Sequence, residues 1–130
     1  MRFVWLVCVL LAGCKPESAR PLHPTTPVIT LRNDSPVTLK RLTVWFPEEV
    51  VGYGDLRPGE SSKPRTVPKA YRYAMAEARV GHRRYAAVVT DYFGEALLPP
   101  GHYTYALTTP QVPADSPNSF SPLRITLERH

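Results

Sequence analysis

The chain offers few side chains whose spacing suggests metal binding. Its four histidines, His23, His82, His102 and His130, lie far apart in the sequence. A zinc site needs three or four ligands around one ion, and it is usually announced by paired ligands a few residues apart. The histidines form no such pair. We therefore expect neither a metal nor another cofactor.

Hydrolytic chemistry can be assembled only from scattered residues. Ser61 or Ser62, with His102 and Asp91, would supply a nucleophile, a base and a carboxylate. The two serines, however, follow a Pro-Gly turn and lack the Gly-x-Ser-x-Gly pattern that exposes a nucleophile. Asp91 and Glu95 would provide the carboxylate pair of a glycosidase, but both fall in one short loop, which favours a turn acceptor and a surface charge. We expect no enzymatic activity.

Tyrosines and arginines form the most suggestive set for ligand binding. On exposed strand faces they would stack on sugars and pair with phosphates. With the rings turned inward, the same pattern describes a sandwich core with phenolic oxygens at its rim. The alternation of tyrosine with arginine and alanine favours this core arrangement, with the arginines solvated. The candidate residues are Tyr71, Arg72, Tyr73, Arg83, Arg84, Tyr85, Tyr103 and Tyr105.

Short strands must position these residues, because the hydrophobic pattern has a period of two in most of the chain. Residues 28–32 form a β-rich run, and the turn cluster at residues 33–36 separates it from a second run at residues 37–46. Further runs cover residues 102–108 and 123–127, and proline-rich segments precede both.

The second run changes the phase of its alternation. Leu39 has the parity of Val37, whereas Leu42, Val44 and Phe46 have the other parity. One inserted residue shifts the inward face in this way. The pattern therefore predicts a β-bulge at Lys40-Arg41.

Two later runs predict a hairpin over residues 69–80 and 83–90, with Gly81-His82 at its tip. A helix is the alternative for residues 70–80, since alanine, methionine and glutamate favour helices. Tyr71 and Tyr73 would splay by roughly 200° around a helix, whereas they share one face of a strand. We therefore expect a strand here.

These elements predict an all-β fold. Regularly spaced short strands with turn signals indicate an antiparallel sandwich of seven or eight strands, immunoglobulin-like or transthyretin-like. Its single domain is expected to cover residues 27–130.

The N-terminal residues suggest where the protein works. An uncharged run from residue 3 to residue 12 follows Arg2, and it is shorter than the about 20 apolar residues that span a bilayer. Its end, Leu11-Ala12-Gly13-Cys14, resembles the lipobox of bacterial lipoprotein precursors. The resemblance implies a signal peptide at residues 1–13, with Cys14 acylated and first in the mature chain. The alternative is an ordinary cleaved leader in which Cys14 is only a small residue.

Lipidation would determine anchoring and compartment. Two or more acyl chains hold a protein stably on a membrane, and residues 14–26, rich in proline, would act as a flexible spacer. In the lipoprotein class, aspartate after the cysteine favours inner-membrane retention. Lys15 therefore implies the outer membrane of a Gram-negative cell, on its periplasmic face. The net charge of +5 allows attraction to anionic polymers, but export disfavours nucleic acid as a partner.

Several short blocks resemble a family of small bacterial lipoproteins of unassigned function. The similarity covers roughly residues 27–108, and it implies export and a compact β domain while transferring no catalytic residue. The blocks are Tyr53-Gly54-Asp55-Leu56, Pro58-Gly59, residues 69–74, residues 91–95, residues 98–101 and residues 103–105.

Two functions follow as expectations. The first is a lipid-anchored envelope protein whose non-catalytic β domain contacts a protein partner or supports envelope structure. The second is a module that binds envelope glycan or lipopolysaccharide through exposed tyrosines and arginines.

Overall fold

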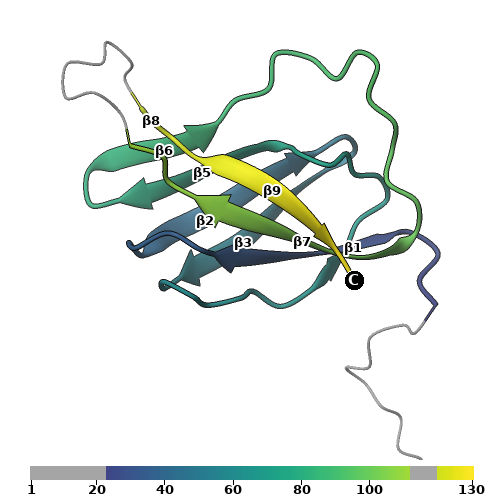
Figure 1. Ribbon diagram of the computed structural model, residues 1–130, viewed down its shortest axis with the longest axis horizontal. Coiled ribbons are helices and arrows are strands. Elements are labelled where there is room, and N and C mark those ends of the chain that lie inside the picture. The colour runs from purple at the N-terminus through teal and green to yellow at the C-terminus, as the bar shows by residue number, and fades with distance from the viewer. Residues whose placement is uncertain (1–22, 112–119) are drawn as a thin grey trace, which may run out of the picture.

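Nine strands pack face to face in two sheets in the computed structural model, which describes residues 23–111 and 120–130 (Figure 1). The four-stranded sheet has the order β4-β1-β7-β9 and the five-stranded sheet the order β3-β2-β5-β6-β8. The strands are β1 (Pro27–Asn33), β2 (Leu39–Phe46), β3 (Glu49–Leu56), β4 (Arg65–Thr66), β5 (Met75–Val80), β6 (Arg83–Ala87), β7 (Gly101–Thr108), β8 (Ser121–Pro122) and β9 (Arg124–Arg129).

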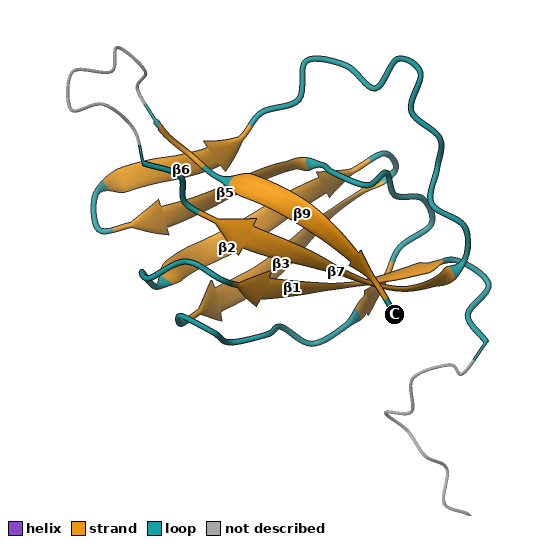
Figure 2. Ribbon diagram, in the orientation of Figure 1, coloured by secondary structure: helices purple, strands orange, loops and turns teal. Residues whose placement is uncertain are grey.

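The predicted all-β sandwich is confirmed. The described part of the chain contains strands and loops but no helix (Figure 2), and therefore no helix that is long and apolar enough to cross a membrane. Seven strands have five or more residues, and β4 and β8 have two each. The signal peptide, Cys14 and residues 14–22 of the spacer lie outside the described residues.

Two strand pairs depart from the antiparallel arrangement that the pattern predicts. β1 pairs with β7 in parallel, from Pro27↔Gly101 to Asn33↔Leu107, and β6 pairs with β8 in parallel. A parallel pair needs a long crossover between its strands. The segment between β1 and β7 supplies it, because it contributes β2, β3, β5 and β6 to the opposite sheet before it returns.

The predicted bulge at Lys40-Arg41 is confirmed. The pairing of β2 with β3 shifts between Leu39 and Leu42, and the pairing of β2 with β5 shifts between Lys40 and Thr43. Arg41 has φ 57°, and its backbone N–H donates to Asp55 Oδ1 at 2.9 Å. Leu39 and Leu42 are both fully buried. The extra residue thus lets both leucines face the core.

The predicted hairpin is confirmed at its tip but is shorter than expected. Val80 pairs with Arg83 around Gly81-His82, whereas residues 69–74 and 88–90 are not in strands. Residues 69–74 adopt neither the expected strand nor the alternative helix. Their backbone is satisfied elsewhere, because Leu98 N donates to Ala70 O and the Tyr105 hydroxyl donates to Tyr71 O.

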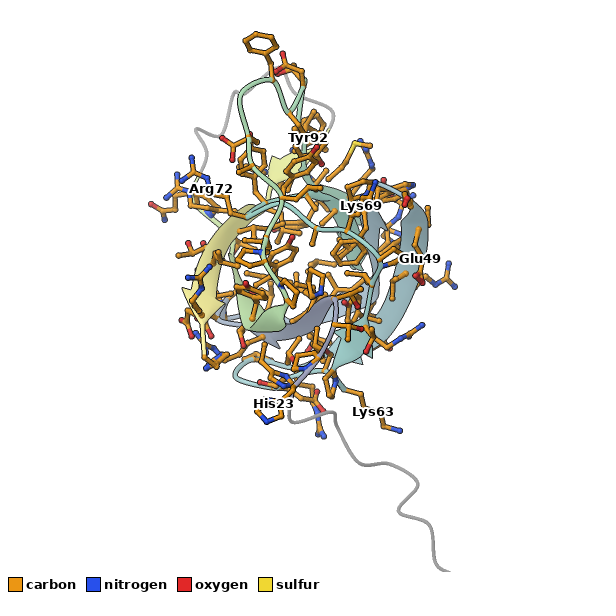
Figure 3. All side chains as sticks on the ribbon, turned by 90° about the vertical axis from the view of Figure 1, so that its right-hand side faces the viewer. His23, Glu49, Lys63, Lys69, Arg72 and Tyr92 are labelled. Atoms are coloured by element: carbon orange, nitrogen blue, oxygen red, sulfur yellow. The ribbon has the colours of Figure 1, made fainter. Side chains whose placement is uncertain are left out.

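The core fills the space between the two sheets, where side chains from both inner faces meet (Figure 3). Alternate residues of β1, β2, β5 and β7 point inward and are almost completely buried. The largest fully buried side chains include Tyr105, Ile29, Leu31, Leu39, Leu42, Leu107 and Val44.

Asn33 is a buried polar residue at the end of β1, with no exposed surface. Its Nδ2 donates to Val37 O at 2.8 Å and to Leu56 O at 2.9 Å. Its Oδ1 accepts hydrogen bonds from Ser35 N at 2.9 Å and from Ser35 Oγ at 2.6 Å. All four bonds that an amide side chain can make are therefore present, and they join β1 to the ends of the opposite sheet.

Replacing Asn33 with alanine should lower the free energy of unfolding by about 3 kcal/mol, because buried carbonyl groups lose their donors. Urea unfolding would measure the change. Thr126→Ala, on exposed β9, is the control and should change stability by less than about 0.5 kcal/mol. A loss at Asn33→Ala no larger than that of the control would contradict the role assigned to this amide.

Candidate functional site

The residues considered for hydrolysis have structural contacts. Ser62 Oγ accepts a hydrogen bond from Leu31 N at 2.9 Å and donates to Lys63 O at 2.9 Å. Asp91 Oδ1 accepts from Phe93 N at 2.9 Å, as expected of a turn acceptor. In the described part of the chain, no group of three or more histidine, cysteine, aspartate or glutamate side chains is arranged to hold a metal ion.

The tyrosines of the predicted ligand-binding set do not share one surface. Tyr103 and Tyr105 are 2% and 0% exposed, so neither ring can stack on a ligand without leaving the core. The Tyr103 hydroxyl donates to Pro99 O at 2.6 Å, and the Tyr105 hydroxyl donates to Tyr71 O. Burial raises the pKa of Tyr105 well above its usual value. For this pair, the arrangement is a core with phenolic groups at its rim.

The arginines of the set contact other residues of the chain. Arg84 Nε lies 2.6 Å from Glu77 Oε2, and its guanidinium lies over the Phe120 ring. Arg83 Nε donates to Ser121 Oγ at 2.8 Å. Arg72, three residues before the start of β5, forms an ion pair with Glu95 at 3.0 Å. Arg72, Arg83 and Arg84 therefore each contact a different partner and do not form one cationic surface.

Tyr71 and Tyr73 are half-buried and stack on a third ring, that of Tyr92. The ring centroids of Tyr71 and Tyr92 are 4.3 Å apart at 15°, and those of Tyr73 and Tyr92 are 5.6 Å apart at 22°. We call these three residues the tyrosine stack. Burial in it raises the pKa of Tyr92. The sequence pattern did not reveal the stack, because Tyr92 lies about twenty positions further along the chain.

The tyrosine stack holds one side of a long loop, residues 88–98, which we call the aromatic loop. A turn forms its tip, where Glu95 N donates to Tyr92 O at 2.9 Å and Gly94 has φ 81°. The Arg72–Glu95 ion pair and the bond from Leu98 N to Ala70 O hold its other side. The loop is therefore fixed to residues 69–74 at several points.

The aromatic loop exposes apolar side chains. Phe93 is 95% exposed at the tip, and Val88 and Leu97 are also exposed. These are three of the five large hydrophobic side chains exposed in the described residues, so the exposure is concentrated here. A hollow of about 260 Å³ lies beside the loop, between Val88 and Leu123. Sequence reasoning missed Phe93, although an aromatic residue beside glycine in a polar turn was an available signal.

The loop lies far from the N-terminal side of the domain. In Figure 3, Tyr92 lies near the top of the molecule, whereas His23, where the described chain begins, lies at the bottom.

Comparisons with known proteins support the fold and leave the function open. No family model and no curated protein matches the sequence. The chain is similar to the NMR structure of a protein from Eubacterium rectale, with a TM-score of 0.50 and 12% identity. The match covers 87% of this chain and 94% of that chain. At this identity the likeness shows the two-sheet fold alone.

Replacing Tyr92 or its neighbour Phe93 with alanine should change the free energy of unfolding by different amounts. Tyr92→Ala removes two ring contacts and should lower the free energy of unfolding by about 1–2 kcal/mol. Phe93→Ala removes an exposed ring and should change it by less than about 0.5 kcal/mol. Urea unfolding of both variants would test this, and an equal loss in both would show that Phe93 packs against the domain.

Proposed function

We propose that this protein is a lipid-anchored component of a bacterial cell envelope whose β domain binds a protein partner through the aromatic loop, without catalysis. One observation carries the proposal. Phe93 is 95% exposed on a loop that its own hydrogen bonds and the tyrosine stack hold in place. An exposed aromatic ring on a fixed support is typical of the anchor residues of protein interfaces.

The chemistry around Phe93 favours a protein over a membrane surface as the partner. Asp91 and Glu95 flank the ring. Arg72 is paired with Glu95, and Arg129 lines the same hollow as residues 94–99. Asp91 forms no ion pair within the described residues, so anionic lipid would repel its carboxylate, whereas a protein pocket with a polar rim would accept an aromatic ring beside it.

The lipobox and spacer support the anchoring half of the proposal. Acylation at Cys14 would fix the chain to a membrane, with Lys15 favouring the outer membrane. The spacer then joins the domain at the side opposite the aromatic loop. The proposed contact would thus be made at a distance from the anchoring membrane, on its periplasmic face.

Lipidation can be tested by mass and membrane partition in a Gram-negative host. The expected mass is that of residues 14–130, which is 130 − 13 = 117 residues, plus acyl chains. Cys14→Ser should move the protein out of the membrane fraction, because it removes the site of acylation. An uncleaved or unacylated wild-type product would overturn the anchor.

The interface can be tested by a photo-crosslinking residue placed at Leu97 in intact cells. We expect one discrete protein adduct, which Phe93→Ser abolishes because the partner loses its aromatic contact. Val50→Ser is the matched control, since Val50 is an exposed apolar residue on β3, and it should leave the adduct unchanged. An adduct that survives Phe93→Ser would contradict the proposal. Retention on peptidoglycan or lipopolysaccharide without any adduct would favour the glycan-binding alternative.

A further inference from the structure

A second surface lies where the β2 bulge meets the β5–β6 turn. A shallow hollow of about 380 Å³ is lined there by Lys40, Arg41, Arg79, Gly81 and His82. We call it the basic pocket. No carboxylate lines it, and its residues come from segments about forty positions apart in the sequence.

The basic pocket brings like charges together across two strands. Lys40 on β2 pairs directly with Arg79 on β5, and Arg79 pairs in turn with Arg84 on β6. Like charges placed opposite each other destabilise a sheet. The charge of Arg84 is balanced by an ion pair with Glu77, in which Arg84 Nε lies 2.6 Å from Glu77 Oε2. Within residues 23–111 and 120–130, the side chains of Lys40 and Arg79 have no ion pair.

The bulge adds a third cation to the same place. Lys40 and Arg41 are consecutive and both exposed, because the extra residue of the bulge turns both away from the core. Arg41 has φ 57° and is the one described non-glycine residue with a positive φ. A left-handed conformation is unfavourable for arginine. Asp55 accepts the Arg41 backbone N–H at 2.9 Å and so holds this conformation.

We infer that the basic pocket is a binding site for a phosphate group, such as a diphosphate or the phosphomonoester of a headgroup. Arginine guanidinium groups match phosphate oxygens in a two-pronged geometry, and lysine adds a point charge. A bound phosphate would relieve the repulsion between Lys40 and Arg79. Gly81 leaves space at one wall, since a Cβ added there would meet no atom within 4 Å.

The site can be tested by titrating the isotope-labelled full chain with inorganic pyrophosphate and following backbone amide NMR signals. We expect saturable shifts at Arg41, Arg79 and Gly81. Arg79→Gln should weaken binding at least about tenfold. Arg57→Gln is the matched control, because Arg57 is an exposed arginine outside the pocket and its loss changes the net charge equally. It should alter affinity by less than about twofold, as expected for a distant surface charge.

Two results would overturn the inference. Shifts that do not saturate, or equal weakening in Arg79→Gln and Arg57→Gln, would show that only net charge attracts the anion. Arg79→Gln should remain folded, since it removes a repulsive exposed charge, and the dispersion of its own NMR spectrum checks this.

A second probe separates a lipid headgroup from a soluble phosphate. The Cys14→Ser full chain would be sedimented with phosphatidylcholine vesicles, with and without phosphatidic acid. Extra binding to phosphatidic acid that pyrophosphate displaces and Arg79→Gln removes would identify a headgroup. Pyrophosphate binding without extra vesicle binding would identify a soluble ligand. Failure of both probes would overturn the site.

Discussion

The amide of Asn33 is the constraint on which the arrangement of the two sheets depends. It lies at the last residue of β1, in the four-stranded sheet, and it bonds carbonyl groups next to β2 and at the end of β3, in the five-stranded sheet. The hydrophobic effect is non-directional, whereas hydrogen bonds require a particular distance and angle. A fully satisfied buried amide therefore selects one relative position of the sheets.

The second connection runs from the core to the aromatic loop. Tyr105 is buried at the centre of β7, and its hydroxyl reaches the backbone of Tyr71. The Tyr71 ring in turn stacks on Tyr92, one residue before Phe93. Contacts through Tyr71 and Tyr92 thus connect the buried core to the exposed ring of Phe93. Such support limits the conformational entropy that the loop would lose on binding.

Local patterns in the sequence predicted the features that depend on neighbouring residues. The phase change in residues 37–46 indicated the bulge, and Gly81-His82 indicated the hairpin tip. β3 was not predicted as an individual strand, because Gly52 and Gly54 interrupt its alternation. Residues 69–74 have the alternation of a strand, yet contacts to Tyr92 and Leu98 determine their path.

The candidate sites were least accessible from sequence. Residue types alone placed Tyr71, Arg72, Tyr103 and Arg84 in one group, but burial and ion pairs divide that group in the structure. The basic pocket depends on strand register, which opposes Lys40 and Arg79. Register is set by the whole sheet and is not evident from either strand by itself.

The parallel pairing of β1 with β7 has a consequence for the order of folding. Pro27 pairs with Gly101, which is 101 − 27 = 74 positions later, so β1 must wait for most of the chain before it gains this neighbour. Contacts of such long range slow folding, because a large loop must close first. Until β7 is available, the pairing of β1 in its sheet is limited to the two-residue strand β4, so most of this largely apolar strand lacks a ladder partner.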